Sequence, residues 1–195
     1  VLMSSPAGSS VYASTGSSCY VTCGRVSFVL GLHGPCASYD TACSASLVGA
    51  HGSMRALQRL ECDAALSAGV NMILNPGTMR SNAIAGFTSV RGRSHTFDSR
   101  ADGYARGEAI DALATRLAQP SSESTEGQGS TYGLIGSAVR QDGRSASLTA
   151  PSGHAQQGVL SASFADARQD RSRMTMLEAH GTGTALGDPI EAGAV

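Results

Sequence analysis

The sequence predicts an α/β domain in which helices cover both faces of a mostly parallel sheet. Three observations predict this class. Apolar residues recur at helical intervals in several stretches, and short, almost wholly apolar runs typical of buried strands lie between them. Neither a repeat nor an inter-domain linker interrupts the chain. The 195 residues are enough for one domain with a real core.

The first predicted helix spans residues 19–32. Its residues Cys19, Cys23, Val26 and Leu30 recur at intervals of three and four, so they share one face. We therefore expect both cysteines to face the core.

Two further helices are predicted, at about 44–60 and at 156–167. The first of these contains Gly49 and Gly52, and each costs a helix about 1 kcal/mol relative to alanine. We expect another backbone to pack against this helix and to require the two glycines.

Three apolar runs are predicted as strands, at 64–74, 131–139 and 173–180. Residues 75–109 are glycine-rich and are predicted as an irregular loop, and a loop of that length in a compact domain usually has a function. Residues 121–130 form a low-complexity stretch that predicts a surface loop.

Composition narrows the possible partners. Charged residues make up 15% of the chain, against about 25% in an average soluble domain. We therefore expect another subunit, or chain outside this sequence, to cover part of the surface. A net charge of −1 provides no basic field for nucleic acid or an anionic membrane. The longest strongly apolar run, VSFVLGL, is too short to span a bilayer.

The ends and the cysteines suggest where the protein works. The chain starts at Val1 without an initiator methionine and stops inside an apolar run, which indicates an internal fragment. Five cysteines without regular spacing predict neither a disulfide framework nor a metal site, and favour a reducing compartment. We expect a cytoplasmic protein. An organelle such as a plastid stays open, because a targeting region would lie outside this sequence.

Cys43 is the candidate nucleophile. In the stretch YDTACSASL it directly precedes the second predicted helix, where unpaired N–H groups and the positive end of the helix dipole favour an anion. Such positions raise the thiolate fraction of a cysteine. Its small neighbours Ala42, Ser44 and Ala45 leave room for a substrate. A buried structural cysteine is the commoner role of a single Cys, and the residues alone leave both interpretations open.

His180 is the second candidate. It ends the last predicted strand and precedes the turn GTGT, so we expect it at the strand end where α/β sheets bind ligands. The turn is no dinucleotide fingerprint, because its glycines follow GxGxxxG and Pro189 interrupts the helix start that such a site needs. An ordinary histidine in a turn is the alternative. We assign no role to the other four histidines.

Four motifs together resemble the β-ketoacyl synthase family, specifically the ketosynthase domain of type I polyketide synthases. They are TACSASL, ADGYARGEA, GSAVRQDGRSASLTAPSG and EAHGTGTALGDPIEA. Their order and spacing, within a match from residue 19 to the last residue, make the resemblance specific. It implies a thiolase-like layered α/β/α/β/α fold, usually as a homodimer. Residues 1–195 would form a partial ketosynthase domain, the end of its N-terminal half plus the start of its C-terminal half, about half of the whole.

The resemblance also implies a decarboxylative Claisen condensation. An acyl group would pass from the phosphopantetheine arm of an acyl carrier protein to Cys43. A malonyl-type thioester on the carrier protein would then lose CO₂, and its enolate would attack the acyl group to extend a polyketide chain. The enzyme would be an acyltransferase without a directly bound cofactor.

Roles carry over from the family to matching residues. His180 would assist decarboxylation and stabilise the enolate, Thr182 and Thr184 would bind the pantetheine arm, and Asp188 and Glu191 would order the site around them. The second catalytic histidine, in an Asn-x-Gly-His motif, and a lysine would lie beyond residue 195. We therefore expect the fragment alone to be inactive.

This sequence departs from the family at one strand. In AIDALATRL, residues 109–117, Asp111 stands where an apolar residue is usual, which affects the expected packing rather than the chemistry.

Alternatives differ in class. A fatty-acid or polyunsaturated-acid ketosynthase would use the same residues. A non-catalytic chain-length-determining partner subunit generally lacks the nucleophile, and decarboxylase-only variants carry Gln in its place, so Cys43 weighs against both. A Cys-His hydrolase would need a base for water, and the sequence offers none.

Overall fold

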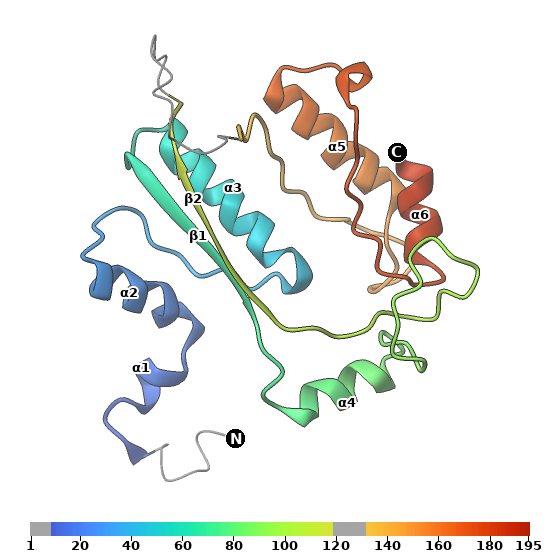
Figure 1. Ribbon diagram of the computed structural model, residues 1–195, viewed down its shortest axis with the longest axis horizontal. Helices are drawn as coiled ribbons and strands as arrows, with labels where there is room; N and C mark the ends of the chain where they lie inside the picture. Colours follow the sequence, from blue (N-terminus) through green and yellow to red (C-terminus); the bar gives the residue numbers. More distant parts are fainter. Residues whose placement is uncertain (1–8, 119–131) are drawn as a thin grey trace. The chain divides into compact units, whose positions relative to one another are not determined.

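The computed structural model describes residues 9–118 and 132–195 (Figure 1). They fall into two compact units. The first comprises the described residues of Val1–Gly69 and Asp111–Ser124, and the second those of Val70–Ile110 and Thr125–Val195. The surface loop predicted at 121–130 lies outside the described residues.

The first unit begins with helices. Helix α1 spans Ala13–Ser17 and α2 spans Cys19–Leu30. A 3₁₀-helix, η3, spans Ala42–Ser44 and continues directly into α3, Ala45–Gln58. Both helices that periodicity predicted here are confirmed within about two residues at each end, which is the usual uncertainty of a helix boundary.

The prediction that α2 buries its cysteines is wrong. Cys19 is exposed, Cys23 is only partly buried, and no residue of the helix is buried. Phe28 and Val29 on the same helix are 88% and 78% exposed. Periodicity reports which residues share a face, whereas burial requires a second surface that packs closely over that face.

The glycines of α3 accommodate a side chain rather than a backbone. A Cβ on Gly52 would lie 2.6 Å from the hydroxyl oxygen of Tyr39, and one on Gly49 would lie 3.9 Å from the same ring. The other side of the helix contributes Met54 and Leu57, the two large apolar side chains that the described residues bury.

Strands β1, Ala64–Asn71, and β2, Ala109–Arg116, form a two-stranded sheet. They run in opposite directions (Figure 1). The strand predicted at 64–74 is confirmed, but the mostly parallel sheet is wrong for the described residues. The other two predicted strands do not form: among the described residues, 132–139 and 174–180 pair with no strand. A strand needs a neighbour to satisfy its backbone groups, and an apolar run alone cannot supply one.

The second unit contains α4, Pro76–Ile84, α5, Gly153–Ala167, the 3₁₀-helix η4, Arg171–Arg173, and α6, Gly187–Ala194. Helices α5 and α6 pack against each other. The predicted helix at 156–167 is confirmed and starts earlier, because the Ser152 side chain caps it by accepting from the Ala155 amide at 3.3 Å.

Helix α4 lies inside the segment predicted as a loop, so that prediction is wrong there. The Asn75 side chain caps it by accepting from the Gly77 amide at 2.8 Å, and Pro76 occupies its first turn. Asparagine followed by proline is a recognised helix start. The helix has almost no apolar periodicity, so the cap was the only local signal.

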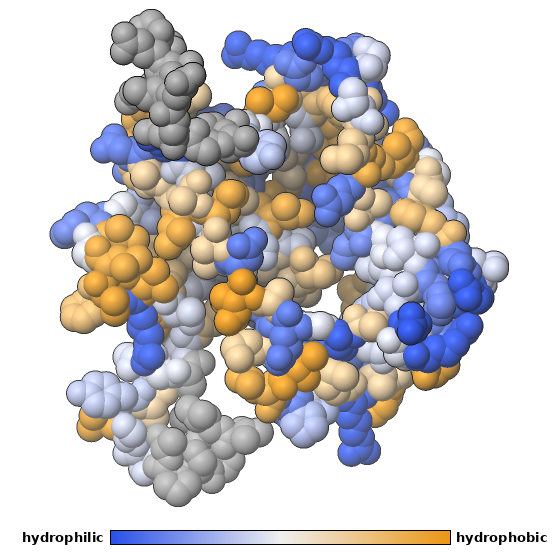
Figure 2. All heavy atoms as spheres, viewed as in Figure 1, coloured by the Kyte–Doolittle hydropathy of each residue, from blue (hydrophilic) through white to orange (hydrophobic). Residues whose placement is uncertain are grey.

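Apolar side chains remain widely exposed in both units, as the orange surface in Figure 2 shows. This agrees with the low charged fraction. None of the helices in the described ranges combines the length and the apolar character that crossing a membrane requires.

Candidate functional site

The backbone turn that follows His180 is held by two carboxylates. Asp188 lies in the first turn of α6, is 3% exposed, and receives three backbone amides. Its carboxylate accepts from Gly183 at 3.0 Å and Thr184 at 3.4 Å within the turn, and from Phe97 at 2.6 Å in a distant loop. Amide donors of this kind are what a buried carboxylate needs in place of water.

Glu191, one helical turn after Asp188, holds the start of the same turn. Its two carboxylate oxygens accept from the backbone amides of His180 at 2.6 Å and Gly181 at 2.8 Å. The backbone of His180 is therefore fixed, while the residue itself remains exposed.

Two further contacts join the loop at residues 94–104 to this turn. The Thr96 hydroxyl donates to the Gly181 carbonyl at 2.6 Å, and the Gly103 amide donates to the Gly183 carbonyl at 3.0 Å. Phe97 has φ 54°, a left-handed conformation that costs a non-glycine residue on the order of 1–3 kcal/mol. Its bond to Asp188 helps to hold that conformation.

The two threonines of the turn lie together. Their hydroxyl oxygens, on Thr182 and Thr184, are 3.2 Å apart, and the Gly187 amide donates to the Thr184 hydroxyl at 3.0 Å. Pro189 was predicted to interrupt the helix start, and that prediction is wrong. It lies in the first turn of α6, where a residue without an N–H loses no helical hydrogen bond.

Cys43 belongs to the first unit. It is exposed in η3, directly before α3, as its position in the sequence predicted. The preceding Ala42 has φ 55°, which is left-handed, and the Ser44 hydroxyl closes the turn by donating to the Thr41 carbonyl at 2.9 Å. Strained backbone of this kind concentrates at functional sites, and no local sequence signal revealed it.

The structure gathers five of the six predicted site residues around one turn of the second unit: His180, Thr182, Thr184, Asp188 and Glu191. Cys43 lies in the other unit. Sequence reasoning missed Thr96 and Phe97, the residues that clasp the turn. Two signals had pointed to their loop: the long segment at residues 75–109 was expected to have a function, and the motif ADGYARGEA begins inside the loop, at residue 101.

The loop at residues 94–104, called the clasping loop below, is rich in charged residues. Hydrogen bonds from Arg100 hold the pKa of the Asp98 carboxyl well below its usual range, and Asp98 raises the pKa of Arg100. The Ser89 hydroxyl, and then Arg91, lower the pKa of Asp102.

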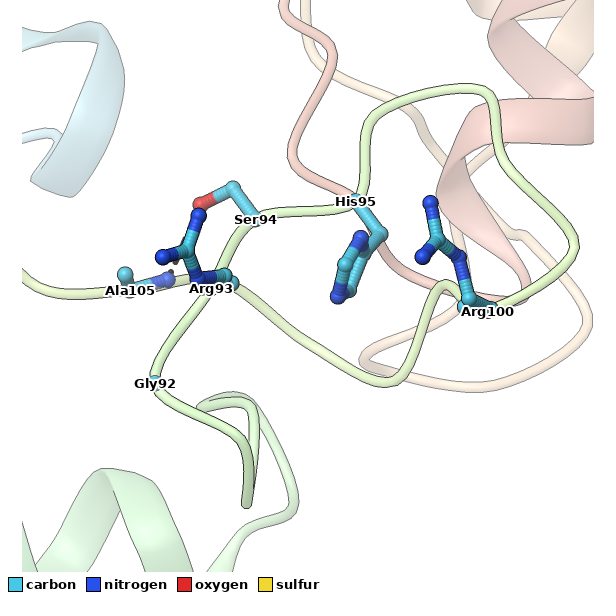
Figure 3. A pocket seen from close by; sticks show the side chains of 6 residues that line it. All are labelled: Gly92, Arg93, Ser94, His95, Arg100 and Ala105. Carbon is cyan, nitrogen blue, oxygen red and sulfur yellow. Dashed lines mark hydrogen bonds between the residues drawn. The ribbon is translucent and has the colours of Figure 1, made fainter.

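An open pocket lies on this loop, and Figure 3 draws the side chains that line it. Its lining residues are Gly92, Arg93, Ser94, His95, Arg100 and Ala105.

Comparisons with solved structures show the fold. A ketosynthase from module 6 of the bacillaene synthase of Bacillus subtilis superposes with a TM-score of 0.84 at 36% identity, over 92% of this chain and 32% of that one. The oxazolomycin ketosynthase domain of Streptomyces albus gives 0.82 at 31% identity, over 91% of this chain and 31% of its own. The α/β elements thus form part of the thiolase-like fold of ketosynthase domains. The chain spans about a third of the length of these solved chains.

Sequence relatives point the same way. A pikromycin polyketide synthase component of Streptomyces venezuelae is 43% identical over 97% of this chain and 5% of its own length. A phenolphthiocerol/phthiocerol polyketide synthase subunit of Mycobacterium tuberculosis is 40% identical over 95% of this chain and 8% of its own. The family models for the N-terminal and C-terminal domains of β-ketoacyl synthase match residues 2–114 and 132–195. The chain therefore belongs to the β-ketoacyl synthase family, and its relatives are polyketide synthases.

Proposed function

We propose that the protein carrying this chain extends a polyketide by decarboxylative Claisen condensation of two thioesters, as an acyltransferase. The observation that carries the proposal is the ordering of the His180 turn by Glu191 and Asp188, in a chain that belongs to this family. The two carboxylates accept from five backbone amides, one of them that of His180, and so fix the backbone from which this exposed histidine projects. Preorganised groups of this kind favour catalysis.

Cys43 is the proposed nucleophile. Its thiolate attacks the carbonyl of an acyl thioester, a C–S bond forms on Cys43 as the C–S bond to the carrier breaks, and the carrier leaves as a thiolate that takes up the proton lost by Cys43. Exchange of one thioester for another is nearly balanced in energy, so the acyl-enzyme can persist until the second substrate arrives. The exposed position of Cys43 before α3 supports this role.

His180 is proposed to act in the second half-reaction. A malonyl-type thioester loses CO₂, and negative charge develops on its carbonyl oxygen as the enolate forms. A fixed N–H donor stabilises that oxygen, and one such donor is commonly worth about 3 kcal/mol of barrier. The enolate carbon then attacks the acyl group on Cys43, and the Cys43 thiolate leaves. The hydroxyls of Thr182 and Thr184 suit an amide-rich pantetheine arm.

The substrates are proposed to arrive on the phosphopantetheine arm of an acyl carrier protein, so the protein itself needs no bound cofactor. The chain would be a partial ketosynthase domain, inactive alone and homodimeric in the full-length protein. The exposed apolar surface of both units supports a covering by further chain.

Measuring acyl loading tests whether Cys43 is the nucleophile. In the full-length protein, Cys43→Ala should abolish the acyl adduct that intact mass spectrometry detects after incubation with an acyl thioester. Cys62→Ala is the matched control, because Cys62 is partly buried elsewhere in the same unit and should leave loading unchanged. An undiminished adduct in Cys43→Ala would refute the assignment.

Measuring the half-reactions separately tests His180. We expect His180→Ala to slow release of CO₂ from a malonyl-type thioester by about 10²-fold or more, while acyl loading of Cys43 stays within a few-fold. Equal losses in both half-reactions would contradict the assigned role.

A fatty-acid ketosynthase would pass both tests and is distinguished by its products. The relatives reported above are polyketide synthases, which favours the polyketide reaction. A non-catalytic partner subunit would fail the loading test.

A further inference from the structure

Cys23 and Cys36 are brought together in the first unit by contacts between α2 and the segment at residues 36–38. The Ser27 hydroxyl donates to the sulfur of Cys36 at 3.4 Å, and the Cys23 amide donates to the Ser38 hydroxyl at 3.4 Å. Cys23 and Ser27 are four residues apart and so share one face of the helix. The segment therefore passes along the face that carries Cys23.

The two thiols lie within reach of each other. The Cys36 thiol hydrogen-bonds to the Cys23 side chain, and the Cys36 sulfur also accepts from Ser27, which lies one helical turn beyond Cys23. Two thiols in contact across neighbouring segments are positioned to form a disulfide. Both thiols are free, Cys36 is exposed and Cys23 is partly exposed.

The surroundings of Cys23 lower the pKa of its thiol. Hydrogen bonding from the Ser38 hydroxyl, and to a lesser extent from the Cys36 thiol, lowers the pKa of Cys23, while partial burial opposes the change. A lower pKa raises the thiolate fraction near neutral pH, and the thiolate is the species that attacks a disulfide.

We propose that Cys23 and Cys36 form a reversible intramolecular disulfide by exchange with a low-molecular-weight disulfide such as glutathione disulfide. The Cys23 thiolate attacks one sulfur of glutathione disulfide, its S–S bond breaks, and one glutathione leaves as a thiolate that takes up a proton. Cys36 then loses its proton and attacks the Cys23 sulfur, and the second glutathione leaves. Two protein thiols are oxidised and one glutathione disulfide is reduced to two glutathiones.

Two other cysteines are the competing partners. A Cβ on Gly34 would lie 3.3 Å from the Cβ of Cys62, so Cys62 lies beside the same segment. Cys19 lies one turn before Cys23 on α2. The contact from Ser27 places Cys36 on the side of Cys23 that points away from Cys19, so we expect both competitors to stay out of the bridge.

Peptide mapping tests the pair on the full-length protein, without relying on activity. The protein is incubated with glutathione disulfide, alkylated, and digested with trypsin and chymotrypsin without reduction. Tyr20 and Arg25 flank Cys23, and Tyr39 separates Cys36 from Cys43, so each thiol falls in its own peptide. We expect a peptide pair joined through Cys23 and Cys36 that dithiothreitol releases.

Single cysteine-to-serine variants identify which two cysteines form the link. In Cys36→Ser the linked pair should vanish and a glutathione adduct should accumulate on Cys23, because the second exchange step has lost its nucleophile. Cys62→Ser and Cys19→Ser should form the wild-type link. A link from either thiol to Cys62 or Cys19, or only mixed disulfides in the unmodified protein, would overturn the proposal.

Discussion

The carboxylate of Asp188 accepts a hydrogen bond from the backbone amide of Phe97 at 2.6 Å, although the two residues are 91 positions apart. The same carboxylate accepts from Gly183 and Thr184 in the turn after His180. One buried side chain thus joins the clasping loop to the turn that carries the proposed chemistry, and the geometry of both depends on it.

Replacing Asp188 with asparagine should weaken this junction. The asparagine side chain would keep one carbonyl oxygen but turn an NH₂ group toward a backbone donor. An unsatisfied buried amide costs about 1–3 kcal/mol, so we expect the free energy of unfolding to fall by that amount in urea titrations of the full-length protein. The control is Asp170→Asn, at the exposed cap of η4, where asparagine caps as well as aspartate. Equal losses in the two variants would contradict the special position of Asp188.

Glu191 is proposed as a positioning residue that acts through His180. Glu191→Gln keeps one of its two acceptor oxygens and Glu191→Ala keeps neither, so decarboxylation should fall in that order while loading of Cys43 is retained. In a His180→Ala background, Glu191→Gln should add little further loss, because residues that act as a unit are not additive. Fully additive losses would show that Glu191 acts independently of His180.

Gly183 is expected to tolerate no side chain. It has φ 74°, and a Cβ there would lie 2.8 Å from the backbone nitrogen of His95. Gly183→Ala should therefore lower the free energy of unfolding by at least about 1–2 kcal/mol from the backbone conformation alone. Gly193→Ala in α6 meets nothing within 4 Å and should stabilise the helix by up to about 1 kcal/mol. Thermal unfolding of both variants checks the contrast, and a neutral Gly183→Ala would contradict it.

The pair of Asp98 and Arg100 should contribute a pH-dependent part of stability. Arg100 lowers the pKa of Asp98 in the folded state, so on acidification the unfolded state takes up the proton first. The stability difference between wild type and Asp98→Asn should be constant near neutral pH. It should shrink as the pH falls through the ordinary aspartate value of about 3.9 toward the lower folded value. Urea titrations from about pH 7 to about pH 2 check this, and a difference that grew on acidification would have the wrong sign. High salt should reduce the effect, because the pair is solvent-exposed.

Local sequence signals predicted the elements whose cause is local. The spacing of apolar residues located α2, α3 and α5, and the apolar run at 64–74 located β1. Helix α4 was missed because its signal is a cap rather than a periodic face. The runs at 132–139 and 174–180 were predicted as strands because they are apolar, but strand pairing is a property of two segments and neither has a strand partner among the described residues.

The candidate site also combines features that local sequence predicts with features that only the tertiary structure shows. Motif order by itself determined the family and singled out Cys43, His180 and the acidic residues that follow it, because these lie within short stretches of sequence. Only the tertiary structure decided that Thr96 bonds to Gly181 and Phe97 to Asp188, across 85 and 91 residues. Such contacts form when the loss of chain entropy on closing a long loop is offset by the hydrogen bonds and packing that the closed loop gains. That balance depends on how the whole unit packs, and no single stretch of sequence contains it.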